Sequence, residues 1–405
     1  MTKNRFDSLY SNLILELGLQ FEKGMSLVIR CAPDYYSFAA KVAKDAYKIG
    51  AINVEIDISD AKLIKERCKN QDLELISKLP KYLEEQDKER AKEKWAFLAI
   101  SDTENNTVLN TTDKDKLGEY TKAKSELTKT GRDGRMNFKI PWCIVCYPMK
   151  KWAKQVLNSS SEDMRDLLTK ILLLDKENPV KAWQEFDEEF RKGNEYLNNL
   201  KIKKLHYVSP ITDLTISLRE EAIWLGGSDE CNNKRLFVNI PTFEHFSVPD
   251  KLSANGYVTT TKPVSVLQTL CNDIRFEIKD GKVVKCEAKE GQEALDRYLK
   301  SDENACYLGE VALVDERTPI AQSKKVFNTI LYDENASCHI AVGAGYPVCL
   351  DTKEPLDSKE KLESYGCNTS RVHTDFMIGS SDLNIFATTY DGKEIQIYKN
   401  GEFTF

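Results

Sequence analysis

The stretch MSLVIRCAPDYYSFAAKVAKDAYKIGAINVEID, residues 25–57, contains a strand pattern, a helix pattern and a second strand pattern in succession. Residues 25–31 are typical of a strand, residues 35–50 have apolar side chains at helical spacing and end at a glycine, and residues 51–57 are typical of another strand. Two strands joined by a helix in this way predict a parallel pair in a sheet that helices cover.

The same alternation continues on both sides of this stretch. A helix is expected at residues 4–21, and further strands are expected at WAFLAIS, residues 95–101, and KIPWCIVCYP, residues 139–148. Residues 159–200 are polar and helical, and they begin with serines that can cap a helix. Residues 1–200 therefore predict an α/β domain with a largely parallel sheet and a helical connector near its end.

The pattern changes after residue 200. Alternating runs are joined by Asp-Gly or Asn-Gly pairs, which favour tight β-hairpin turns. These pairs are Asp280-Gly281, Asp391-Gly392 and Asn400-Gly401. One short helix, at residues 291–300, interrupts the strands. Residues 201–405 therefore predict an α+β domain rich in antiparallel strands.

Composition excludes several classes of function. The net charge is -6 and the isoelectric point is about 5.6, whereas a nucleic-acid-binding face requires a basic surface. The first residues contain no apolar signal core, and no apolar run approaches the roughly 18 residues that span a bilayer. We therefore expect no nucleic-acid or membrane partner and a cytoplasmic location.

Eleven cysteines, an odd number, indicate reduced thiols and not a disulfide framework. Cys143 and Cys146 are the one closely spaced pair. Positions three apart in a strand point to opposite faces, so a redox or zinc pair is less expected here than two buried strand cysteines.

Histidine is scarce in this chain, which has four, at positions 206, 245, 339 and 373. His339 lies among small and apolar residues in the run NASCHIAVGAGY, residues 335–346. A single histidine in such a run is more often a core residue than a ligand. We expect His206, which lacks an acidic neighbour, and His245 to be structural.

Three other segments favour a ligand role for His339. In SRVHTDFMIG, His373 and Asp375 are two apart in a predicted strand, so both side chains project from one face and could hold a cation. Glu310 lies in the otherwise apolar strand CYLGEVALVD, where an ionised carboxylate needs a partner or a metal. Glu244 follows a proline-stiffened bend in NIPTFEHFSVPD, which can present a carboxylate at the rim of a site.

Each of these residues also has a structural explanation. Glu310 could pair with a buried Lys or Arg, Asp375 could cap a turn, and Glu244 could lie in solvent. With His339 and His373 they form a mixed nitrogen and oxygen set that suits Zn²⁺, Co²⁺ or Mn²⁺. Five such groups are enough for two ions that share a bridging carboxylate.

Several motifs, in this order, make the chain similar to a known family. They are ITDLTISL, NIPTFEHFSVPD, GYVTTTKP, YLGEVALVD, NTILYDENASCHIAVGAGYP and HTDFMIGSSDLNI, with a fainter match in LILELGLQFEKGMSLVIR. The chain resembles the aminopeptidase T and aminopeptidase S family of thermophilic-type dinuclear metallo-aminopeptidases. The resemblance implies a homodimer with an enclosed catalytic chamber, and two divalent ions per chain, zinc or cobalt with manganese or magnesium as alternatives.

The resemblance also assigns roles to individual residues. The motifs carry the family's metal ligands onto five residues: Glu244, Glu310, His339, His373 and Asp375. The resemblance therefore implies that residues 201–405 form the metal-binding catalytic domain. Glu310 takes the place of the carboxylate that both ions share, which makes it catalytic as well. Tyr346 matches the family's site tyrosine and could donate a hydrogen bond to the oxyanion of the intermediate, although a packed aromatic ring beside a Gly-Pro bend is the alternative.

One departure concerns substrate preference and not the ligand set, because Phe243 stands where many family members have a second glutamate. The expected function is removal of the N-terminal residue from peptides with a free N-terminus by a metal-activated water. The alternative is a peptide-binding or scaffold protein that kept the fold without the activity. A decayed site of that kind should lack at least one of the five ligands, and the sequence lacks none.

Overall fold

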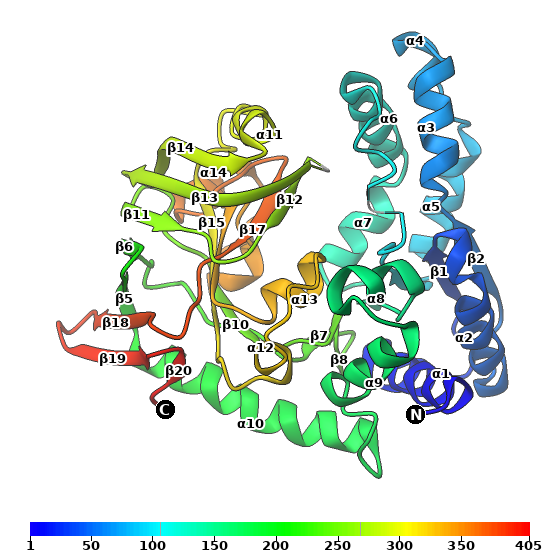
Figure 1. Cartoon of the computed structure of the whole chain (residues 1–405), viewed down its shortest axis with the longest axis horizontal. Helices are drawn as coiled ribbons and strands as arrows, with labels where there is room; N and C mark the ends of the chain where they lie inside the picture. The colour runs from blue at the N-terminus through cyan, green and yellow to red at the C-terminus, as the bar shows by residue number, and fades with distance from the viewer. Residues whose placement is uncertain (106, 268) are drawn as a thin grey trace. The chain divides into compact units, whose positions relative to one another are not determined.

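The computed structural model describes residues 1–105, 107–267 and 269–405, which form two compact units (Figure 1). The first unit comprises residues 1–184 and 228–241, and the second comprises residues 185–227 and 242–405. The chain passes from one unit to the other within a long helix, α10, Pro179–Leu200.

The first unit is built on a five-stranded sheet in the order β2-β1-β3-β4-β9, and each neighbouring pair is parallel. The strands are β1 (Leu27–Cys31), β2 (Val54–Ile58), β3 (Ala96–Ile100), β4 (Trp142–Val145) and β9 (Asn239–Ile240). The predicted parallel sheet is confirmed. The edge strand β9 belongs to residues 228–241, which also form the small hairpin of β7 (Asp229–Cys231) and β8 (Lys234–Leu236).

Helices separate these strands along the chain. They are α1 (Lys3–Leu13), a π-helical turn (Ile14–Gly18), a 3-10 turn (Pro33–Tyr35), α2 (Tyr36–Ile49), α3 (Ala61–Asn70), α4 (Leu73–Ile76), α5 (Tyr82–Lys92), α6 (Lys114–Leu127), α7 (Lys129–Met136), α8 (Lys150–Leu157) and α9 (Ser161–Ile171).

Local sequence explains two of the helix boundaries. Helix α2 buries Phe38, Val42 and Ala46 on one face and ends at Gly50, whose φ of 111° suits glycine. Helix α9 begins at a capping box that starts from Ser160, as the serine run predicts.

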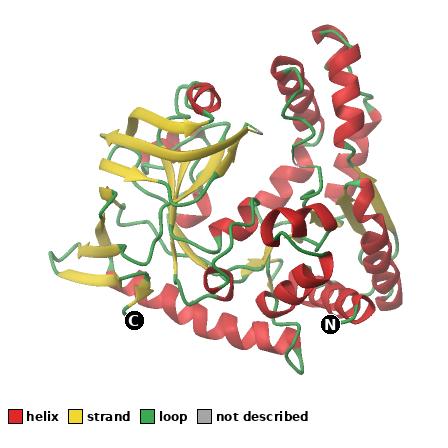
Figure 2. Cartoon of the chain, viewed as in Figure 1, coloured by secondary structure: helices red, strands yellow, loops and turns green. Residues whose placement is uncertain are grey.

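Strands dominate the second unit, as Figure 2 shows for β5, β6 and the strands labelled from β10 to β20 in Figure 1. Its larger sheet has the order β12-β13-β11-β6-β5-β18-β19-β20, and β14 pairs with β13. The strands are β5 (Ile202–Ser209), β6 (Thr212–Ser217), β11 (Asn255–Thr259), β12 (Val264–Val266), β13 (Thr269–Lys279), β14 (Lys282–Glu290), β18 (Asn384–Thr389), β19 (Glu394–Lys399) and β20 (Glu402–Phe403). The predicted antiparallel α+β half is confirmed.

Two of the predicted hairpin turns adopt the expected backbone. Asp280 and Gly281 join β13 to β14 with φ values of 49° and 77°, and Asn400 and Gly401 join β19 to β20 with φ values of 52° and 88°. Positive φ at both central residues is typical of the type I′ turns that match strand twist.

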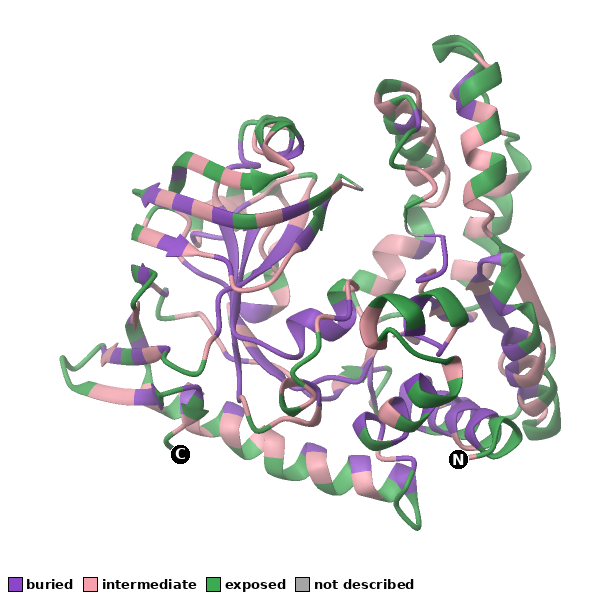
Figure 3. Cartoon of the chain, in the orientation of Figure 1, coloured by how far each residue is buried: buried purple, intermediate pink, exposed green. Residues whose placement is uncertain are grey.

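A second, four-stranded antiparallel sheet has the order β10-β15-β16-β17. Its strands are β10 (Glu244–Ser247), β15 (Leu308–Val314), β16 (His339–Gly343) and β17 (His373–Met377). One face of this sheet shares a hydrophobic core with the larger sheet, through Val311, Leu313, Ile340, Val342 and Phe376. These strands are almost wholly buried (Figure 3).

The remaining helices of the second unit are short. They are α11 (Gln292–Tyr298), α12 (Pro319–Gln322), α13 (Ile330–Glu334), a 3-10 turn (Pro347–Cys349) and α14 (Lys359–Ser364). Within the described residues, no helix is both long and apolar enough to cross a membrane. Within the described residues, no disulfide bond joins any two cysteines. Cys143 and Cys146 are buried, as expected.

Candidate metal centre

Strand alternation sorts the four-stranded sheet into an apolar face and a polar face. Successive side chains point to opposite faces of a sheet. His339 therefore points away from the core face, to which its neighbour Ile340 points. His373 and Asp375 likewise point away from the core face, to which Phe376 points. The five predicted ligands therefore project from four strands, on the face of the sheet that is not packed in the core. The sheet brings all of them together, in two overlapping groups.

A β-bulge aims the Glu310 side chain at this face. The pairing register of β15 against β16 shifts between Leu308 and Glu310, which leaves Gly309 as the extra residue. Leu308 consequently packs in the core although it is two residues from Glu310. A Cβ atom at Gly309 would lie 2.2 Å from the carbonyl oxygen of Ala344, so the bulge requires glycine.

Small residues leave space between the polar side chains. Ala341 is paired with Glu310 on one side and with Asp375 on the other. Ala312 and Gly343 are paired with the two histidines of the set. A larger side chain at Ala341 would fill the space between Glu310 and Asp375, and a Cβ atom at Gly343 would lie 2.1 Å from the carbonyl oxygen of Val372.

Glu310 belongs to both groups. In the first group, His339 Nε2 lies 3.2 Å from Glu244 Oε2 and 3.6 Å from Glu310 Oε1. In the second, His373 Nε2 lies 3.4 Å from Glu310 Oε2 and 3.2 Å from Asp375 Oδ1. Each group keeps its ligand atoms within 4.8 Å of one another. One carboxylate thus offers a separate oxygen to each of two compact sites.

Backbone carbonyls orient both imidazole rings. His339 Nδ1 donates to the carbonyl oxygen of Ser337 at 3.1 Å, and His373 Nδ1 donates to that of Ala344 at 2.7 Å. A proton held on Nδ1 leaves the lone pair on Nε2, and Nε2 is the atom that faces the carboxylates in each group. This arrangement is the one commonly found for histidines that bind metal ions.

The carboxylates have oxygens that the protein leaves without hydrogen bonds. Glu244 Oε2 and Asp375 Oδ1 are buried and accept no hydrogen bond of good geometry from the described residues. Such groups are costly in a protein interior unless a cation neutralises them. The orphaned oxygens, the oriented imidazoles and the mixed donor set fit two divalent ions of the zinc and cobalt type.

In the protein without bound metal ions, the two histidines of these groups hold their protons tightly. Burial acts to lower the pKa of His339, but Glu244 and Glu310 outweigh it and raise that pKa well above its usual value. His373 has a raised pKa because Asp375 likewise outweighs burial. Burial raises the pKa of Glu244, whereas His373 overcomes burial and lowers the pKa of Asp375. Cations and protons therefore compete for the same atoms.

Tyr346 lies beside the second group. Its ring centroid is 4.8 Å from that of His373, and Phe246 packs against its edge at 5.9 Å. Burial, followed by the negative charge of Glu310, raises the pKa of the Tyr346 hydroxyl well above its usual value. The hydroxyl therefore keeps its proton and can donate a hydrogen bond in the site.

Glu334, for which no role was predicted from the sequence, lies near the same groups. It ends α13 and is buried, and its Oε1 accepts a hydrogen bond from Asn335 Nδ2 at 3.4 Å. Asn335 Oδ1 in turn accepts from the Phe243 backbone at 2.5 Å, next to Glu244 in the chain. Burial and the nearby charges of Glu244 and Asp375 raise its pKa well above the usual value. Among the described residues, no lysine or arginine pairs with it.

The other two histidines lie outside these groups. His206 Nε2 lies 2.8 Å from Asp213 Oδ1 on the neighbouring strand β6, so the expectation that it lacks an acidic neighbour was wrong. The two side chains meet across the hairpin of β5 and β6, and both are exposed to solvent. His245 is buried beside α10 and stacks on Phe190, with ring centroids 3.9 Å apart, and burial lowers its pKa to about 3.

Comparison with known proteins agrees with the fold. The profile of the thermophilic metalloprotease (M29) family matches residues 5–403. This chain belongs to the M29 family.

Curated M29 relatives align along nearly their whole length. Aminopeptidase AmpS of Bacillus subtilis is 32% identical over 402 residues, which cover 98% of each protein. Aminopeptidase T of Thermus thermophilus is 30% identical over 399 residues, which cover 97% of each. The solved structure of wild-type AmpT from Thermus thermophilus superposes with a TM-score of 0.91 at 29% identity and covers 100% of both chains. The M29 family is one of metallopeptidases, which is the chemistry that the cluster can support.

Proposed function

We propose that this M29 chain is a dinuclear metallo-aminopeptidase that removes the N-terminal residue from peptides. One observation carries the proposal: the two oxygens of Glu310 face two separate groups, each completed by a histidine and a second carboxylate. A carboxylate shared in this manner is a frequent bridge in two-metal hydrolytic sites. The aminopeptidase relatives support the choice of substrate.

The chain supplies the ligands and their environment. Glu244, Glu310 and His339 would hold one divalent ion, and Glu310, His373 and Asp375 the other. When bound, the ions would polarise the scissile carbonyl and lower the pKa of the attacking water. Zinc and cobalt suit these donors best, with manganese or magnesium as alternatives.

Tyr346 has a role that the ligands do not. Its protonated hydroxyl can donate a hydrogen bond to the carbonyl oxygen as that oxygen gains negative charge during attack. Because the hydroxyl is held beside His373, it needs no reorganisation at that moment. Its contribution would therefore appear in the rate of reaction more than in substrate binding.

Glu334 is the group that we assign to the α-amine of the substrate. A further buried carboxylate next to the cluster, with no basic side chain paired to it among the described residues, can accept a protonated amine. An aminopeptidase needs such a group to distinguish a free N-terminus from an internal peptide bond.

The scaffold alternative is not favoured. A protein that had lost catalysis would have no need to keep five ligands, two oriented imidazoles and a glycine bulge beneath the shared carboxylate. Homodimer formation and a cytoplasmic location stay predictions.

A direct experiment compares two substrates on the same preparation. The protein loaded with Zn²⁺ or Co²⁺ should release the chromogenic amine p-nitroaniline from leucine p-nitroanilide and should not act on the same compound when its α-amine is acetylated. Equal rates on both would contradict aminopeptidase specificity. No hydrolysis of either, with metal bound in full, would favour the scaffold alternative.

A further inference from the structure

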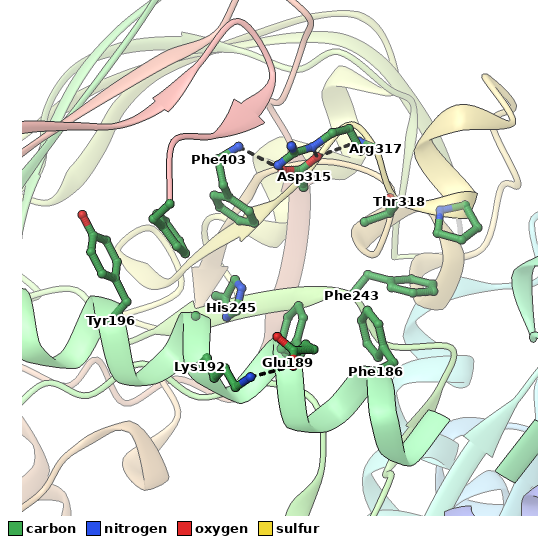
Figure 4. Close-up of a pocket in the computed structure, with 14 residues that line it drawn as sticks. Phe186, Glu189, Lys192, Tyr196, Phe243, His245, Asp315, Arg317, Thr318 and Phe403 are labelled. Carbon is green, nitrogen blue, oxygen red and sulfur yellow. Dashed lines mark hydrogen bonds and ion pairs between the residues drawn. The ribbon is translucent and has the colours of Figure 1, made fainter. Parts of the chain in front are cut away.

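A separate pocket of about 560 Å³ lies within the second unit, on the other side of β10 from the metal cluster. Its walls come from α10, from β10, from the segment after β15 and from the last residues of the chain. Figure 4 shows His245 between the side chains of α10 and Phe403. Six aromatic side chains line the pocket: Phe186, Phe190, Tyr196, Phe243, Phe403 and Phe405.

The charged groups of this pocket neutralise one another. Asp315 receives two bonds from the Arg317 guanidinium, at 2.7 Å and 2.5 Å, and one from the Phe403 backbone at 2.9 Å. Lys192 pairs with Glu189 at 2.6 Å. Figure 4 shows these pairings as dashed lines. Each charged side chain among the described residues that line the pocket is therefore paired with an opposite charge, which favours a neutral occupant.

Hydrogen bonds fix the tautomer of His245 in the pocket wall. Asn194 Nδ2 donates to the carbonyl oxygen of Gly226 at 3.0 Å, which sets the orientation of the amide. Asn194 Oδ1 must then accept from His245 Nδ1, 2.6 Å away. No carboxylate lies within ion-pair distance of His245 in the described parts of the chain. A buried neutral ring with its proton on Nδ1 presents a lone pair at Nε2.

Gly193 keeps this lone pair accessible. It lies in the interior of α10, where glycine costs about 1 kcal/mol relative to alanine. A Cβ atom at this position would lie 2.9 Å from His245 Nε2 and 3.5 Å from the Phe405 ring. Within the described structure, no hydrogen bond is made to Nε2. The wall of the pocket thus contains one unused acceptor among aromatic rings.

We propose that this pocket binds a small neutral aromatic molecule that carries one hydrogen-bond donor, such as a phenol or an indole, with the donor on His245 Nε2. Aromatic walls suit a flat ring, and partly exposed rings of Phe190, Tyr196 and Phe403 gain burial when one enters. Phe243 and His245 flank Glu244 on β10, so the occupant would rest against the reverse side of the strand that presents a metal ligand.

Calorimetry on the wild-type protein provides the first test. Phenol and indole should bind, and their methylated counterparts anisole and N-methylindole should bind roughly tenfold more weakly because they leave Nε2 unpaired. Equal affinities within each pair would overturn the proposal. Because binding is measured without substrate turnover, the result is independent of the aminopeptidase assignment.

Substitutions locate the site. His245→Phe keeps an aromatic ring but removes the acceptor, so phenol affinity should fall about tenfold while anisole affinity is unchanged. Gly193→Ala places a methyl group against Nε2 and should weaken phenol in the same way. His206→Phe, at an exposed histidine outside the pocket, is the matched control and should bind phenol as the wild type does.

Two outcomes would contradict the proposal. The first is unchanged phenol affinity in folded His245→Phe, with folding checked by circular dichroism. The second is absence of any phenol or indole binding to the wild-type protein. Self-association in sedimentation would then indicate that a second copy covers the pocket. If His245→Phe does not fold, the methylated ligands on the wild-type protein decide the question alone.

Discussion

Glu310→Gln is the substitution that bears most directly on the shared carboxylate. It keeps the volume of a side chain that is 4% exposed and replaces one oxygen by an amide nitrogen. The two oxygens lie 3.6 Å and 3.4 Å from the imidazole Nε2 atoms of the two groups, so the change removes charge from both. Removing one partner of a buried charge pair typically costs about 3–5 kcal/mol, and a loss of that size corresponds to roughly 10²- to 4 × 10³-fold weaker metal binding.

The assay for this prediction counts ions. Elemental analysis after gentle purification should find fewer than two ions per chain in Glu310→Gln, and hydrolysis of leucine amide should fall by at least the same factor. Glu104→Gln is a matched control, since Glu104 is also buried but lies in the first unit and accepts from the Trp152 backbone at 2.9 Å. Two ions per chain with wild-type turnover in Glu310→Gln would refute the reasoning.

Four further outcomes are expected. Tyr346→Phe should bind both ions and nearly as much substrate, while its kcat falls by roughly 10²–10³, and a change confined to KM would argue against an oxyanion donor. His339→Ala should lose metal affinity, which calorimetric titration of the stripped protein with Zn²⁺ can measure; full occupancy would mark the imidazole as structural. Glu334→Gln should raise KM for free-amine substrates with both ions retained, and an unaltered KM would remove it from amine binding. In the protein stripped of metal, protonation of His339 and His373 stabilises the fold, because their pKa values are raised in the folded state. This stabilisation is fully present below a pH of about 6.5 and is lost as the pH rises through the raised pKa values. The increase in melting temperature that Zn²⁺ causes should therefore become larger as the pH rises through that range. An increase that is the same at every pH would contradict this prediction.

Local patterns were enough to predict the elements that carry the site. Apolar runs such as the one around Glu310 form strands because each side chain can be buried, and Asn400-Gly401 forms a hairpin because both residues tolerate positive φ. The spacing of His373 and Asp375 in β17 places both on one face for the same reason.

Long-range pairing could not be predicted in this way. The order β10-β15-β16-β17 joins segments that are distant in sequence, and no local pattern indicates which strands become neighbours. Position 309 requires glycine because the Ala344 backbone approaches it closely. That contact joins segments distant in sequence, so the need for glycine could not be inferred from the sequence alone. Residues 228–241 join the first unit by the same kind of distant pairing.

Glu334 and His206 show how a missed residue could have been found. Glu334 lies five positions before His339, on a short helix whose end is set by tertiary contacts, and the acidic pair Asp333-Glu334 next to a ligand strand was the available signal. His206 pairs with Asp213 across the β5–β6 hairpin, which the register of a two-strand turn would have indicated.

The central claim is that this chain holds two ions that share Glu310, and an anomalous difference map from crystals grown with Zn²⁺ tests it most directly. Two peaks are expected, one among Glu244, Glu310 and His339 and the other among Glu310, His373 and Asp375. A single peak, or two peaks of which either lies away from Glu310, would contradict the account.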